Sequence, residues 1–126
     1  MTVTRFQDLP LTGRDHEWDA AAAERRVREL TGATDEPTPG YRDAHIWYDG
    51  EAPGNYSSYK LLVADVVDGR LTVVPRAVQA AGAVLQGARG GVDLPQDEVA
   101  RVRGHLERYY RKMGDEPPWG DEDVPS

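Results

Sequence analysis

Three stretches of the chain place apolar residues at the three- and four-residue spacing of an amphipathic helix. The first covers residues 16–30, and Asp15 directly before it is the expected N-cap. The second begins at Pro75, a residue that suits the first turn of a helix. The third covers residues 97–113, with two acidic residues in its first turn and Gly114 as its stop signal. The pattern therefore predicts three helices, one early and two late in the chain.

Between the first two helices the apolar period changes to two, which is typical of strands. Residues 41–48 alternate in this way and predict one strand, after a loop over residues 31–40 that contains two prolines and two glycines. Residues 59–67 and 71–74 predict two more strands, and Asp68-Gly69 between them is a tight-turn signal of the kind found in hairpins. The order helix, strand, hairpin, helix, helix indicates an α+β fold, in which a small antiparallel sheet (the hairpin plus one strand) packs on two to three helices.

Both ends of the chain lie outside these patterns. We expect an extended N-terminal arm over residues 1–13, a single α+β domain over residues 14–114 and an acidic C-terminal tail over residues 115–126. The arms carry apolar residues with no local core to receive them, and Trp119 is expected to dock on its own domain or on a neighbour. The candidate partner-binding residues are therefore Phe6, Leu9, Leu11, Pro117, Pro118 and Trp119.

Charge is distributed unevenly along an acidic chain with a net charge of −7. Residues 96–113 hold five bases and three acids, whereas residues 115–126 hold five acids and no base. A nucleic-acid binder usually shows a concentrated basic patch and a high pI, so we expect no direct contact with nucleic acid. No apolar run approaches the roughly 20 residues that span a bilayer, so no membrane contact is expected either.

Residue types that carry chemistry are few. The chain has no cysteine, and its three histidines (His16, His45 and His105) fall on three different predicted elements without metal-binding spacing. Ser57-Ser58 could approach His45 but lacks the turn of a serine nucleophile. The glycines of residues 87–91 close a helix, whereas phosphate-binding glycines open one. We therefore expect no catalytic, cofactor-binding or metal-binding residues, and no enzyme activity.

Several short segments resemble proteins encoded among the head genes of tailed phages and prophages of actinobacteria. They are residues 14–19 (Arg-Asp-His-Glu-Trp-Asp), Tyr59-Lys60-Leu61, Asp68-Gly69, Val74-Pro75-Arg76-Ala77 and Leu106-Glu107-Arg108-Tyr109-Tyr110. The last four resemble an accessory module that occurs alone or attached to head-morphogenesis proteins. The resemblance implies a role in capsid assembly and carries over no catalytic residue.

The resulting hypothesis is a structural, capsid-associated protein, either a decoration or a minor capsid protein, that binds the shell and stabilises it. Its partners would be the major capsid protein or other head proteins, with a possible homo-oligomer, and it would reside in the virion after assembly in the host cytoplasm. The alternative is a cytoplasmic regulatory or adaptor module that binds a basic protein partner through the acidic tail. A small enzyme with an unrecognised site is a third reading, and a deep pocket with perturbed titratable groups would reveal it.

Overall fold

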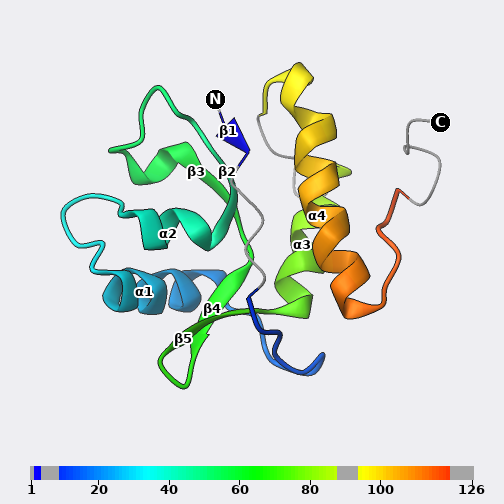
Figure 1. Cartoon of the computed structure of the whole chain (residues 1–126), viewed down its shortest axis with the longest axis horizontal. Helices are drawn as coiled ribbons and strands as arrows, with labels where there is room; N and C mark the ends of the chain where they lie inside the picture. Colours follow the sequence, from blue (N-terminus) through cyan, green and yellow to red (C-terminus); the bar gives the residue numbers. More distant parts are fainter. Residues whose placement is uncertain (1, 4–8, 88–93, 120–126) are drawn as a thin grey trace.

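The computed structural model of the chain describes residues 2–3, 9–87 and 94–119, and it has an α+β fold, as the sequence predicts. Two helices lie on one side of the strands and two on the other (Figure 1). The helices are α1 (Ala20–Thr31), α2 (Pro39–Asp43), α3 (Pro75–Leu85) and α4 (Val99–Met113). The strands are β1 (Thr2–Val3), β2 (His45–Tyr48), β3 (Tyr59–Leu62), β4 (Ala64–Val67) and β5 (Arg70–Val73). Single turns of 3-10 helix, η1 (Tyr56–Ser58) and η3 (Gln96–Glu98), precede β3 and α4.

The strands form two small antiparallel sheets, whereas the sequence pattern predicted one. The first sheet has the order β1-β2-β3 and the second is the hairpin β4-β5. The predicted strand over residues 59–67 is divided at Val63, because its backbone serves two other segments. The Val63 N–H donates to the carbonyl of Ala44, and the Val63 carbonyl accepts from Val74. Just before this point Leu61 has a φ of 61°, a left-handed conformation that is rare for a bulky residue.

The turn between β4 and β5 confirms the hairpin signal. Asp68 and Gly69 have φ values of 53° and 76°, so both central residues adopt the left-handed conformation that matches the twist of a two-residue hairpin. Beyond the hairpin, the N-terminal segment runs along β5. The Thr12 N–H donates to the carbonyl of Val73 at 2.9 Å, and the Val73 N–H donates to the carbonyl of Pro10 at 2.8 Å. This part of the predicted arm is therefore bound to the domain.

Three helix boundaries differ from the sequence prediction. Helix α1 begins four residues later than expected, because Asp19 rather than Asp15 is the N-cap and its Oδ1 accepts from the N–H of Ala22. Helix α2 occupies the end of the predicted loop and the start of the predicted strand, where the Thr38 side chain caps it. Helix α4 begins at Val99, since the two acidic residues before it lie in η3. Pro75 and Gly114 begin and end helices as predicted.

The core consists of two clusters of buried side chains. The larger one joins α3, α4 and β2, and the smaller one joins α1, α2, β3 and β4. Helices α3 and α4 contribute buried residues at helical spacing, including Val78, Ala81, Val102, Leu106 and Tyr109. Burying a Val or Leu side chain gives about 1.5–3 kcal/mol, so these two helices contribute to the stability of the larger cluster.

Candidate functional site

Trp119, one of the candidate partner-binding residues near the C-terminus, lies in the larger core cluster. Its side chain is 4% exposed, and its indole Nε1 donates to Glu107 Oε1 at 2.8 Å. The ring meets Tyr110 edge-on with centroids 6.1 Å apart, and the guanidinium of Arg103 lies 5.6 Å from its centroid. Docking on the chain's own domain, one of the two outcomes expected for Trp119, is therefore confirmed. Residues 115–119 lie against the domain, and we call this segment the docked strap.

Arg14 fastens this strap to the rest of the domain. Its guanidinium donates to the carboxylate of Asp115 and to the carbonyl of Met113, at the C-terminal end of α4. The hydrogen bond from Arg14 lowers the pKa of Asp115 and raises the pKa of Arg14 itself. At the next turn of the strap, Pro118 packs over Gly82 of α3, where a Cβ atom would lie only 3.2 Å from the proline ring. Arg14, near the N-terminus, thus holds the segment that follows α4 in place.

The other predicted partner-binding residues are distributed between core and surface. Leu9 and Leu11 are partly buried and pack against the same cluster as Trp119. Pro117 is half-buried, and Pro118 is exposed. Phe6 lies outside the described residues. Their role in binding a partner stays a prediction, and a contact through the Trp119 ring would require the strap to undock.

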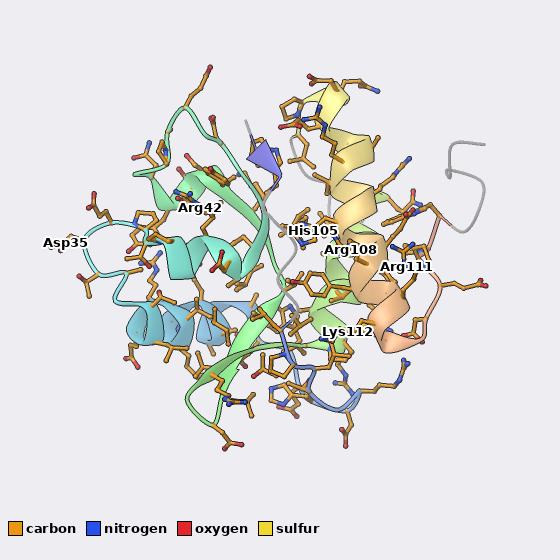
Figure 2. All side chains as sticks on the ribbon, in the orientation of Figure 1. Asp35, Arg42, His105, Arg108, Arg111 and Lys112 are labelled. Atoms are coloured by element: carbon orange, nitrogen blue, oxygen red, sulfur yellow. The ribbon has the colours of Figure 1, made fainter. Side chains whose placement is uncertain are left out.

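A basic face on α4 is the clearest surface feature that reasoning from the sequence did not locate. The helix contains five bases and one acid, and that acid, Glu107, is engaged by Trp119. Arg101, Arg108, Arg111 and Lys112 are exposed, and Figure 2 shows the last three on the C-terminal half of the helix. The signal was present in the sequence, because residues 101, 108 and 112 repeat at helical spacing on one side of the helix.

A second group of charges lies on the opposite half of the molecule and joins α1 to β4. Arg26 donates to both oxygens of Asp65, at 2.7 and 2.8 Å, and His16 Nε2 lies 3.6 Å from the same carboxylate. Burial by itself raises the pKa of Asp65, which is 2% exposed. Hydrogen bonds from Arg26 and from the Val66 N–H outweigh burial, so the pKa is lowered. Both carboxylate oxygens of Asp65 thus accept hydrogen bonds that hold α1 against β4.

His45 is also a structural residue. Its Nδ1 bonds to the carbonyl of Tyr41 at 2.9 Å, and its ring lies 4.6 Å from the Tyr41 ring. Burial lowers the pKa of His45 to about 4, so the imidazole is neutral at pH 7. Among the described residues, no three His, Cys, Asp or Glu side chains form a group suited to a metal ion. Over the same residues, no helix is long and apolar enough to cross a membrane.

Comparison of the chain with family models, with curated proteins and with solved structures found no match. Among the described residues, the exposed feature with the clearest chemistry is the basic face of α4.

Proposed function

We propose that this chain is a structural protein of a tailed-phage head, which binds the capsid shell as a decoration or minor capsid protein and stabilises it. The short segments that resemble head-gene modules support this proposal. Seven of their twenty residues are buried in the core, among them Leu106, Tyr109 and Tyr110. Their exposed members include both acids, such as Glu17 and Asp19, and the cations Arg76 and Arg108. The two exposed cations of the later segments lie on α3 and α4.

The observation that carries the proposal is the basic face of α4 in a chain of net charge −7. A cluster of exposed arginines on an acidic protein is poorly suited to nucleic acid, because the rest of the molecule repels phosphates. It suits an acidic patch on a protein surface, where charge complementarity steers association and sets the register of docking. The partner would be the major capsid protein or another head protein that presents such a patch.

The test is co-sedimentation of the purified chain with empty shells of the major capsid protein encoded beside it. We expect saturable binding at a fixed ratio per capsid subunit that weakens as salt is added, because exposed charges are screened. The variant Arg108→Glu/Arg111→Glu should lower occupancy at least about tenfold, since it replaces attraction with repulsion. The control variant Arg25→Glu/Arg70→Glu makes the same change in net charge on exposed positions of α1 and β5.

The outcomes separate the proposal from its rivals. Binding that both variants weaken equally would reflect net charge alone and would remove the α4 face from the proposal. Absence of binding to shells of every maturation state would refute the capsid role. Circular dichroism of each variant before the assay establishes that the fold is retained.

The adaptor alternative requires a different experiment from simple deletion of the tail. Residues 115–119 are part of the docked strap, so their removal would damage the core. Ending the chain after Gly120 removes the acids Asp121, Glu122 and Asp123 and keeps the strap. Shell binding should survive this truncation, whereas binding of a basic partner through the tail would be lost.

A further inference from the structure

A polar cleft lies between the first sheet and the residues that lead into α4. It has a volume of about 560 Å³, which falls in the range of ligand-binding sites in proteins. We call its polar lining residues, all from the segment 49–60, the polar wall, and Trp47, Leu94 and Pro95 the apolar wall. The lining residues are Trp47, Asp49, Ala52, Asn55, Ser57, Ser58, Lys60, Leu94 and Pro95.

The polar wall is held in a fixed shape by consecutive turns. Between β2 and η1 the Ala52 N–H donates to the carbonyl of Asp49, and the Asn55 N–H donates to the carbonyl of Ala52. The loop is closed by the Asp49 N–H, which donates to the carbonyl of Ser58 at 2.9 Å. The hydroxyl of Tyr59 also donates to the carbonyl of Pro53 at 2.8 Å. A cleft built in this way needs little ordering when a ligand binds.

Trp47, in the apolar wall, is also held in place by its neighbours. Trp47 and Lys60 are opposite each other in the pairing of β2 with β3, so both side chains lie on the same face of the sheet. The indole Nε1 of Trp47 donates to Glu98 Oε1 at 3.4 Å. Glu98 is itself buried, and it lies in η3 directly before α4. The aromatic ring of this cleft therefore has a set position.

Lys60 is the one cation among the lining residues of the cleft. Within the described part of the chain, no carboxylate lies within ion-pair distance of its ammonium group, although the residue is half-buried. The neighbouring Asn55, Ser57 and Ser58 can both donate and accept hydrogen bonds, which matches the N–H and carbonyl groups of a peptide. Oδ1 of Asp49 accepts a hydrogen bond from the N–H of Glu51, which holds this carboxylate against its own loop.

We infer that this cleft binds an extended peptide segment that carries an acidic side chain. The carboxylate pairs with Lys60, the peptide groups bond to the amide and hydroxyl side chains, and a neighbouring apolar side chain packs against Trp47 and Pro95. A phosphate group fits less well, because it carries up to about two negative charges, whereas the lining residues include one cation, Lys60, and the acidic Asp49. The cleft is separate from the basic face of α4, and the inference does not depend on the capsid role.

The chain has only two lysines, Lys60 and Lys112, and this permits a direct test. Reductive methylation with 13C-formaldehyde labels both lysines and the N-terminal amine and keeps their positive charge, and Lys→Arg variants assign the NMR signals. The probe is an acetylated, amidated pentapeptide with a central glutamate flanked by alanine and leucine. Its control is the same peptide with glutamine in the centre.

We expect saturable shifts of the Lys60 methyl signal with the glutamate peptide, little change at Lys112, and an affinity at least about threefold lower for the glutamine peptide. Lys60→Gln should reduce binding of the unlabelled protein by a similar factor in calorimetry, whereas Lys112→Gln should not. Thermal unfolding of both variants checks that they fold.

Three results would overturn the inference. Equal shifts at both lysines would indicate attraction to any cation on the surface. Equal affinity for the two peptides would remove the acidic side chain from the proposal. Sodium acetate that binds as tightly as the glutamate peptide would reduce the cleft to a site for small carboxylates. Because these experiments use the chain alone, failure here leaves the shell-binding experiment unaffected.

Discussion

Replacing Trp119 with alanine tests the docked strap directly. The ring is 4% exposed although it lies six residues beyond Met113, the last residue of α4. If it packs in solution as the structure describes, its loss should destabilise the whole domain. A ring on a free arm, or one that docks only on a neighbour, would instead be removed without cost to the fold.

The size of the effect follows from the buried area. A tryptophan buries about 150–250 Å², and at about 25 cal/mol per Å² this corresponds to about 4–6 kcal/mol. Residual compactness of the unfolded chain reduces the figure by about 10–40%, so we expect a loss of about 3–5 kcal/mol from the free energy of unfolding. Trp119→Phe keeps most of the apolar area and loses the hydrogen bond to Glu107, so it should cost about 1–2 kcal/mol.

The assay is urea unfolding followed by far-UV circular dichroism, because tryptophan fluorescence changes with the substitution itself. The free energy of unfolding and its dependence on urea are compared for wild type, Trp119→Ala and Trp119→Phe. A loss below about 1 kcal/mol for Trp119→Ala, with an unchanged urea dependence, would contradict docking of the strap. That result would return Trp119 to the surface and restore it as a direct contact for a partner.

Three further predictions concern stability. Arg26→Ala leaves the buried carboxylate of Asp65 without its main partner and should cost about 3 kcal/mol at pH 7 in urea unfolding. The wild-type carboxylate has a lowered pKa and stabilises the fold above its unfolded pKa, so this deficit should shrink in acid. His45 has a folded pKa of about 4, below its unfolded value of 6.5, so its neutral form contributes stability that is lost as the pH falls between these values. Unfolding at pH 5 should therefore show about 2 kcal/mol less stability from this group than at pH 7.5, and His45→Gln should abolish that difference. Gly82→Ala should lower the melting temperature, because its Cβ would lie 2.3 Å from a tyrosine hydroxyl, whereas Gly104→Ala meets no atom within 4 Å and should raise it.

Elements with strong local signals were predictable from the sequence. The start of α3 at Pro75 and the end of α4 at Gly114 follow from the fixed φ of proline and the left-handed φ of glycine. The hairpin turn at Asp68-Gly69 was predictable because Asp and Gly tolerate the left-handed φ that this turn requires. The basic face of α4 was also readable in principle, because helical spacing places its residues together.

Other elements depended on contacts that sequence patterns do not encode. The N-cap of α1 moved from Asp15 to Asp19, since two acids near the start of a helix have equal capping power and packing selects between them. Helix α2 replaced the end of a predicted loop and the start of a predicted strand, because Thr38 and Pro39 supply a start signal that the neighbouring glycines obscured. These differences are short in sequence but decide which residues face the core.

The sequence by itself determined the α+β class, the two late helices and the hairpin, because each depends on residues within a few positions of one another. Only the tertiary structure decided the division of the sheet at Val63, the docking of Trp119 and the ion pair between Arg14 and Asp115. These two charged residues are 101 positions apart in the chain. Such contacts form only after the two core clusters have brought distant segments together, and local propensity carries no information about them.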